Sequence, residues 1–339
     1  SENQQMHSIH KNFWLQCFTF RILVATLAYA FPANAEISLE RGWRASPVFL
    51  QSIEYSSDGQ SLLTASGGGV AQLWSLDGVA GPQFKGQRPP MFNAHFNAIG
   101  TELITTGYDG TVWVWSPRGE RLRAYQMHRA ATTEAQFLPS LDGELPGYAT
   151  SSDDGQIVIR NSEGKSLWVG QFVGTARQVI SNHDGSLIIA SSDSGQLHFI
   201  RPSNKRTSAS VDSYQTPHGR INQIAFSNDQ QRIVVAGKDG TATIWTLTGK
   251  QQQRLKASTI GWSRGGVYCN THGQSVLTVG DDGIVREWST SGLLVDSLRL
   301  SSAMKLSGID CSPDGRQAVV IGSDGELWIL SVSPNQGEK

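Results

Sequence analysis

A pattern of about forty residues recurs seven times along this chain, and it restricts the possible folds more than any other feature. In each copy a turn glycine stands five residues before Trp or another large residue. The glycines are Gly69, Gly110, Gly155, Gly195, Gly240, Gly283 and Gly325. Successive glycines are 41, 45, 40, 45, 43 and 42 residues apart. This period matches one four-stranded propeller blade, which predicts an all-β chain of seven blades.

Each copy also marks its hairpin turns. Five of the glycines follow directly after Asp, at Asp109, Asp154, Asp239, Asp282 and Asp324. An Asp-Gly pair between two apolar runs favours a hairpin, because Gly accepts a positive φ and Asp bonds the turn backbone. A second turn residue follows four positions after the large residue. It is Gly in five copies and Asn204 in the fourth, where we expect Asn to adopt the left-handed conformation.

The seventh copy is incomplete. Its second turn position is Pro334, and five residues follow it in the sequence, too few for a fourth strand. The segment 36–43, EISLERGW, alternates apolar and polar residues ahead of the first complete copy. We expect this segment to pair as the missing strand, because closing the ring removes the exposed edges of an open array.

The copies resemble the WD40-repeat β-propeller family. The segments SIEYSSDGQSLLTASGGGVAQLWS, INQIAFSNDQQRIVVAGKDGTATIWTLTGK and IDCSPDGRQAVVIGSDGELWILS match its order of strand, turn, strand, turn and strand with Trp. The resemblance covers residues 36–333, and Trp-Ser/Thr followed by a turn Gly is similar to bacterial, notably cyanobacterial, members. It implies a seven-bladed WD40-type propeller that binds partners through the loops of one face.

Two departures from the family pattern affect its buried hydrogen-bond network. The Asp that follows Trp in the family is absent throughout, and the Gly-His before the first strand survives only as His128 and His218. We expect blade five, with His218, Asp239 and Trp245, to retain part of this network as a contribution to fold stability.

The first 35 residues differ from the repeats. Arg21 precedes an apolar run at residues 22–31, and small residues follow at Ala33 and Ala35, where a signal peptidase reads the chain. We expect a signal peptide that is cleaved after Ala35, and export to a periplasm or an equivalent lumen. The alternative is a membrane anchor formed by residues 13–31, in which Arg21 at the centre costs about 3 kcal/mol.

The domain organisation follows from these two features. We predict a signal peptide at residues 1–35, with a candidate N-terminal remnant at 1–5, a propeller at 36–333 and a short C-terminal tail at 334–339.

Charge and cysteine content exclude several classes of protein. The formal net charge is −1 and no block of like charges occurs, which argues against binding to nucleic acid or, after signal cleavage, strongly to membranes. Three cysteines form neither a disulfide framework nor a zinc motif. We expect Cys269 and Cys311 to be separate buried thiols, since equivalent strands of neighbouring blades are not expected to approach within the ~7 Å that a disulfide needs.

No complete catalytic arrangement is present in the sequence. Residues 261–265, GWSRG, match the GxSxG pattern, but no helix is expected after Ser263, and His272 precedes Asp281, the wrong order for that hydrolase type. Phosphate-binding, zinc-protease and calcium-loop patterns are missing as well. The sequence therefore predicts a protein that is not an enzyme and needs no cofactor or metal.

A polar set on the innermost strands leaves a second interpretation open. Blades 7, 1, 2 and 3 carry Asp310, Glu54, His95 and Gln136 there. Because the ring closes, these side chains are expected to face one side of the central channel. Hydration by channel water is one interpretation. The other is a metal or small-ligand site, or an unrecognised lyase or hydrolase.

Partner contacts are expected on the face that carries the Asp-Gly turns and the residues leading into the innermost strands. By the WD40 resemblance they include Tyr108, Arg129, Arg220, Lys238, Trp262, Arg264, Met304 and Lys305. Tyr, Trp, Met and Arg are enriched at interface cores. The insertion at residues 138–147, on the opposite face, is a weaker candidate. The sequence thus predicts a rigid platform for another protein or complex and leaves the oligomeric state open.

Overall fold

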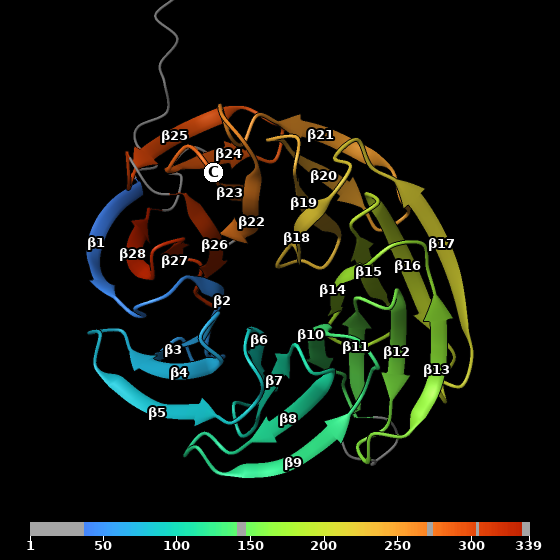
Figure 1. Cartoon of the computed structure of the whole chain (residues 1–339). Helices are drawn as coiled ribbons and strands as arrows, with labels where there is room; N and C mark the ends of the chain where they lie inside the picture. Colours follow the sequence, from blue (N-terminus) through green and yellow to red (C-terminus); the bar gives the residue numbers. More distant parts are fainter. Residues whose placement is uncertain (1–36, 141–146, 270–273, 303–304, 334–339) are drawn as a thin grey trace, which may run out of the picture. The chain divides into compact units, whose positions relative to one another are not determined.

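The computed structural model describes residues 37–140, 147–269, 274–302 and 305–333 (Figure 1). Within these ranges all regular structure is β-strand, and the described residues form one compact unit. Seven four-stranded antiparallel sheets surround a central axis as the blades of a propeller. The predicted fold class is therefore confirmed.

The first four blades follow one another along the chain, each running from the channel outwards. Blade one contains β2 (Leu50–Tyr55), β3 (Ser61–Ser66), β4 (Val70–Ser75) and β5 (Ala80–Lys85), and blade two contains β6 (Met91–Phe96), β7 (Leu103–Gly107), β8 (Thr111–Trp115) and β9 (Arg121–Gln126). Blade three contains β10 (Thr132–Phe137), β11 (Tyr148–Ser152), β12 (Gln156–Arg160) and β13 (Ser166–Gln171), and blade four contains β14 (Ala176–Ser181), β15 (Ile188–Ser192), β16 (Gln196–Pro202) and β17 (Ala209–Gln215).

Blades five to seven complete the ring. Blade five contains β18 (Ile221–Phe226), β19 (Arg232–Gly237), β20 (Ala242–Thr246) and β21 (Gln251–Leu255), and blade six contains β22 (Ser263–Cys269), β23 (Ser275–Gly280), β24 (Ile284–Ser289) and β25 (Leu294–Arg299). Blade seven contains β26 (Leu306–Cys311), β27 (Gln317–Gly322) and β28 (Glu326–Val332), and β1 (Ile37–Arg44) is its outermost strand.

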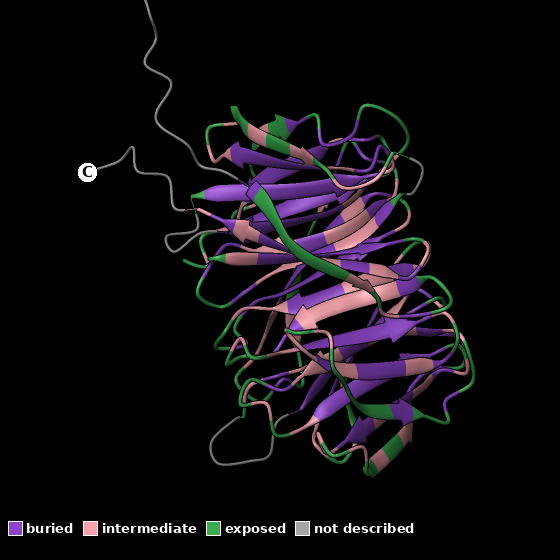
Figure 2. Cartoon of the chain, turned by 90° about the vertical axis from the view of Figure 1, so that its left-hand side faces the viewer, coloured by how far each residue is buried: buried purple, intermediate pink, exposed green. Residues whose placement is uncertain are grey.

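The ring closes as the sequence predicts. Strand β1 pairs antiparallel with β28, with Ile37 opposite Val332 and Arg44 opposite Glu326. Seven hydrophobic clusters each join two adjacent blades among the described residues, and one of them packs Leu50 of blade one against Leu327 of blade seven across the closure. Figure 2 shows these buried positions within the strands and the exposed ones along loops and outer strands.

The turn predictions are confirmed at every repeat glycine and wrong at one Asn. All seven repeat glycines have φ between 72° and 90°. In blade four, however, the left-handed residue is Arg206, with φ 54°, and not Asn204. The third strand there continues to Pro202, which lengthens the turn. The Arg206 side chain is buried and donates a hydrogen bond to the Pro139 carbonyl oxygen at 2.9 Å, so a tertiary contact stabilises this turn.

Blade five contains the complete buried hydrogen-bond network of which the sequence predicts part. His218 Nδ1 lies 2.8 Å from Asp239 Oδ1, and His218 Nε2 lies 2.7 Å from Thr243 Oγ1. The Trp245 indole N–H donates to the same Thr243 hydroxyl at 2.8 Å. These bonds tie the loop before the innermost strand to the turn and the third strand, so the network stabilises the blade.

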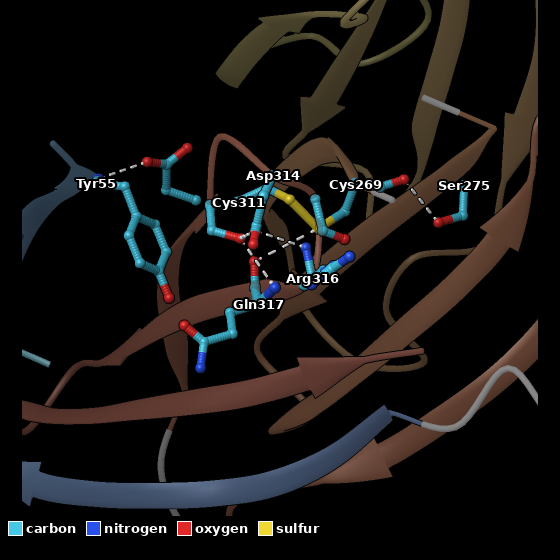
Figure 3. The surroundings of a disulfide bond; sticks show 10 residues. Tyr55, Cys269, Ser275, Cys311, Asp314, Arg316 and Gln317 are labelled. Atoms are coloured by element: carbon cyan, nitrogen blue, oxygen red, sulfur yellow. Dashed lines mark hydrogen bonds between the residues drawn. A yellow bond between two sulfur atoms is a disulfide. The ribbon is translucent and has the colours of Figure 1, made fainter. Parts of the chain in front are cut away.

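The prediction of two separate thiols is wrong, because Cys269 and Cys311 form a disulfide (Figure 3). Their Cα atoms are 5.6 Å apart, on the ends of β22 and β26. Innermost strands of neighbouring blades converge around the channel, so equivalent positions come closer than blade spacing suggests. The bridge joins blade six to blade seven, where the ring closes.

Several predicted segments lie outside the described residues. They are the signal peptide, with its candidate remnant and alternative anchor, the C-terminal tail, and residues 141–146 of the insertion. In the part of the chain that the structure describes, no helix is long and apolar enough to cross a membrane.

Candidate interaction site at the mouth of the channel

Every innermost strand has a β-bulge at its second residue. Pairing with the next strand skips this residue in all seven blades, at Gln51, Phe92, Thr133, Arg177, Asn222, Arg264 and Ser307. A bulge leaves one residue out of the ladder and redirects its side chain. The repeat therefore places seven side chains around the channel axis at one level.

These seven side chains line a cavity of about 190 Å³ at one end of the channel, which we call the mouth. The mouth opens on the face that carries the turns between second and third strands, and this is called the top face below. Arginines from three consecutive blades also line the mouth: Arg177 of blade four, Arg220 before blade five and Arg264 of blade six. The cavity wall is therefore strongly cationic on one side.

Trp262 stands next to these arginines, directly before β22. Arg264 lies 4.3 Å from the centre of its indole ring and Arg220 lies 5.3 Å from it. The ammonium of Lys238 lies 5.5 Å from the same centre. Three cations thus surround one aromatic ring, an arrangement worth about 0.5 to 2 kcal/mol per contact depending on exposure. Three of the residues predicted from sequence thus contact a fourth, Trp262.

Asp281 fixes the geometry of this cluster from below. It accepts hydrogen bonds from Arg264 Nε at 2.6 Å and from the Trp262 backbone N–H at 3.1 Å, and Lys305 Nζ lies 3.4 Å away. Partial burial by itself raises the pKa of Asp281, but the bonds from Arg264 and Trp262 outweigh it and hold that pKa below its ordinary value. Asp281 is therefore an anion that holds Arg264 in place.

Arg177 and Arg220 lack such a partner. Among the described residues, the Nε atom of each is buried and has no hydrogen-bond acceptor. Burial lowers the pKa of Arg220, and the neighbouring charges of Arg177 and Arg264 lower it further. The mouth therefore holds positive charges that repel one another and donors that are not used within the protein.

The other predicted contact residues lie apart from this cluster. Tyr108 is half exposed on the turn between β7 and β8 of blade two, with Arg88 5.8 Å from its ring centre. Arg129 is exposed on the loop before β10. Met304 is outside the described residues. The structure thus gathers five of the eight predicted residues over blades five to seven and leaves two over blades two and three.

Deeper in the channel the side chains are acidic. His95 of β6 lies between two carboxylates, with its Nδ1 3.3 Å from Glu54 Oε2 and its Nε2 in contact with Glu134. Burial opposes protonation of His95, but Glu134 and Glu54 outweigh it and raise its pKa well above the ordinary value. Burial raises the pKa of Glu134, and that of Asp310 to about 7.

The predicted channel cluster links neighbouring blades. Glu54 accepts a hydrogen bond from the Phe96 backbone N–H at 3.0 Å, and Asp310 accepts one from that of Tyr55 at 2.8 Å. Gln136 accepts one from the Ser181 N–H at 2.9 Å. Each bond crosses from one innermost strand to the next. Glu54 and His95 are in contact, Asp310 acts on them electrostatically, and Gln136 has no contact with the other three.

Comparison with known proteins agrees with this architecture. The WD40 family model, described as WD domain, G-beta repeat, matches residues 210–246, which contain the complete network of blade five. The WD repeat-containing protein slr1409 of Synechocystis sp. is 38% identical over 301 residues, 89% of either chain. The chain belongs to the WD40-repeat family. A WD40 propeller is a fold typical of protein-interaction platforms, and proteins of this kind are generally non-catalytic scaffolds.

More distant similarities extend to eukaryotic proteins. The SIR4-interacting protein SIF2 of Saccharomyces cerevisiae is 21% identical over 83% of this chain and 46% of its own length. The target of rapamycin complex subunit LST8 of the same yeast is 26% identical over 48% of this chain and 55% of its own length.

The geometry of this WD40 protein gives little support to a catalytic serine at Ser263 or to a metal site. Ser263 of the GxSxG segment is buried as the first residue of β22 and does not stand on a strand-to-helix turn. Across the ranges that the structure describes, no group of three or more His, Cys, Asp or Glu side chains is arranged to hold a metal ion.

Two residues of the channel were not predicted from the sequence. Arg177 occupies the bulge position in blade four that Arg264 occupies in blade six, so aligning the strands by their first residue would have found it. Glu134 occupies a buried position of β10, where a carboxylate carries no sequence signal. Its role depends on His95 and Asn93 from the next blade, which only the folded ring brings close.

Proposed function

We propose that this WD40 protein is an exported, non-catalytic platform or assembly factor that binds a partner protein through its top face. The observation that carries the proposal is the cluster around Trp262, in which three cations surround one aromatic ring on a rigid rim. Trp and Arg are the residues that most often dominate binding energy at interfaces. Because the propeller holds them in place, little ordering entropy is lost on binding.

The names of the two yeast relatives support a platform role. One is described as SIR4-interacting, and the other as a subunit of a complex. We extend to this chain only the general property that both names share, which is association with other proteins.

Two features support export. The first is the signal-peptide pattern that ends at Ala35. The second is the Cys269–Cys311 disulfide, because structural disulfides persist mainly in oxidising compartments. A periplasm or an equivalent lumen satisfies both.

The test is capture of a C-terminally tagged chain from its native host after mild crosslinking. We expect one stoichiometric partner, and an N-terminus at Glu36 in the captured chain, read by mass spectrometry. Trp262→Ala should weaken the partner about tenfold or more, since the ring lies at the centre of the cluster, and Tyr108→Ala should weaken it less. Both variants should remain folded at the temperature of the assay, because neither side chain belongs to a core cluster, although Trp262→Ala also loses its cation–π contacts.

The matched control is Ile99→Ala. Ile99 is 75% exposed on the loop between β6 and β7, on the opposite face, and its loss should leave the partner bound. Recovery of the chain alone, or a partner that tolerates both top-face substitutions, would contradict the platform. A chain that retains residues 1–35 in the cytosol would contradict export.

A further inference from the structure

We propose that the mouth binds carboxylate side chains, so that the partner of this WD40 protein presents an acidic, extended segment to the top face. The inference rests on the proposed function and specifies the chemistry of the partner. The binding position is the cavity lined by Arg177, Arg220 and Arg264. The segment continues from it across Trp262 towards Lys238 and Lys305.

The first argument is hydrogen-bonding capacity. A guanidinium has five N–H donors in a planar fork that matches the two oxygens of a carboxylate. The buried Nε atoms of Arg177 and Arg220 have no acceptor among the described residues. These Nε atoms lie beneath the surface, so a ligand carboxylate is bound through the terminal N–H groups of the two guanidiniums, whose residues line the cavity.

The second argument is charge. Arg177, Arg220 and Arg264 come from three consecutive blades and repel one another, and their mutual effect lowers the pKa of Arg220 in addition to burial. Asp153 and Asp193 are close enough to act on Arg220 electrostatically. Asp281 is already engaged by Arg264 and Lys305. An incoming anion therefore meets a positive field that these carboxylates offset only in part.

The third argument excludes a cationic or zwitterionic ligand. The acidic group nearest to the mouth is Glu134, which also lines the cavity. Both of its oxygens are occupied, because Oε2 accepts a bond from Asn93 and Oε1 contacts His95. The negative charge of Glu134 is thus already offset by His95 within the protein. Among the described residues, the hydrogen-bonding groups of the cavity wall that lack partners are the N–H donors of its arginines.

The fourth argument concerns size and shape. A volume of about 190 Å³ equals roughly six water molecules, enough for a side chain and too small for a folded element. Lys238 and Lys305 stand outside the cavity, on the rim of the same half of the top face. An extended segment with several carboxylates places one carboxylate in the mouth and others against the lysines of the rim.

The probe is a rhodamine-labelled peptide of about six glutamates spaced by glycine, with a glutamine peptide of the same length as the neutral comparison. Binding to the purified chain is followed by fluorescence anisotropy at about 20 mM and about 200 mM salt, since surface charges are screened at the higher value. We expect the glutamate peptide to bind, the glutamine peptide not to bind, and affinity to fall with salt.

The decisive variant combines Arg177→Gln with Arg220→Gln, and we expect it to bind the glutamate peptide about tenfold more weakly or worse. Its matched control combines Arg118→Gln with Arg316→Gln, which removes the same charge from exposed positions on the opposite face. The control should bind as the wild type does. Because removal of two arginines can disturb folding, a second variant with Arg177→Lys and Arg220→Lys keeps the charge and removes the fork, and it should also bind more weakly.

Three outcomes would overturn the inference. They are equal binding by the mouth variant and its control, equal binding of both peptides, and tighter arginine-dependent binding of inorganic phosphate or an oligonucleotide than of the glutamate peptide. The capture experiment separates this inference from the proposed function. A captured partner that the glutamate peptide does not displace leaves the platform intact and removes the acidic segment. Peptide binding without any captured partner supports the acidic segment and contradicts the platform.

Discussion

The arginines of the mouth and the acidic side chains of the channel differ in how the fold pairs them. At the mouth, Arg177 and Arg220 have buried donors without acceptors. Glu134, which lines the same cavity, has both oxygens engaged by residues of the neighbouring blade. The difference shows that a polar side chain in a propeller channel does not by itself mark a ligand site. What marks a ligand site is hydrogen-bonding capacity that no other group of the folded chain satisfies.

The same comparison shows what the polar residues that the sequence singles out on the innermost strands do in the structure. Glu54, Gln136 and Asp310 stand out in the sequence because the family usually has small apolar residues there. In the structure each accepts a backbone hydrogen bond from the next blade. These side chains connect neighbouring innermost strands, so they contribute to ring stability, whereas the bulged arginines face the open mouth.

The largest difference between the two regions is expected for stability. Glu134→Ala leaves His95 buried with one remaining carboxylate and leaves Asn93 without its acceptor, so we expect a loss of about 3 to 5 kcal/mol in the free energy of unfolding. Arg177→Gln at the mouth should change it by less than about 0.5 kcal/mol. Urea denaturation measures both. If the two substitutions cost the same, the mouth is structural and the comparison fails.

The disulfide provides the next largest effect. Replacing Cys269 and Cys311 together by Ser should cost about 4 kcal/mol, because the bridge closes a loop with a sequence separation of 42 residues between blades six and seven. A thermal unfolding scan of the wild type with and without dithiothreitol should show the same loss on reduction. An unchanged midpoint, together with equal thiol titres before and after reduction, would show that no bridge forms.

The smallest effect is a pH dependence in the interior. Burial, with the charge of Glu54, raises the pKa of Asp310 to about 7, above its unfolded value of about 3.9. A raised native pKa means that the stabilising contribution is present at low pH and is lost as pH rises from about 4 to about 7. Asp310→Asn keeps an acceptor for the Tyr55 N–H and removes the charge.

We therefore expect Asp310→Asn to be more stable than the wild type at about pH 8, with the difference vanishing near pH 4. Urea denaturation across this range measures it. Asp77→Asn, on an exposed turn, is the control and should shift the curve little. A variant that is less stable at high pH would mean that the ionised Asp310 is the stabilising form.

How far the sequence predicts the structure depends on whether a feature repeats. The turn glycines and the Trp positions were predictable because each is a local requirement written several times in one register, and β1 was predictable because the seventh copy of that register lacks its fourth strand. Trp74, Trp115 and Trp288 each donate to a Thr ten residues earlier, which confirms how regular that register is. Features unique to one blade were not predictable: Arg206 in its turn, and the arginine at the bulge of blade four.

The sequence by itself determined the number of blades, the position of their turns and the closure of the ring, because hydrophobic alternation and glycine torsion act over a few residues. The tertiary structure alone decided which side chains from different blades meet. It brought Cys269 within bonding distance of Cys311 and placed Glu134 against His95. It also gathered the arginines of blades four to six at the mouth. Those contacts depend on convergence of the innermost strands around a closed axis, a property of the whole ring that no single repeat contains.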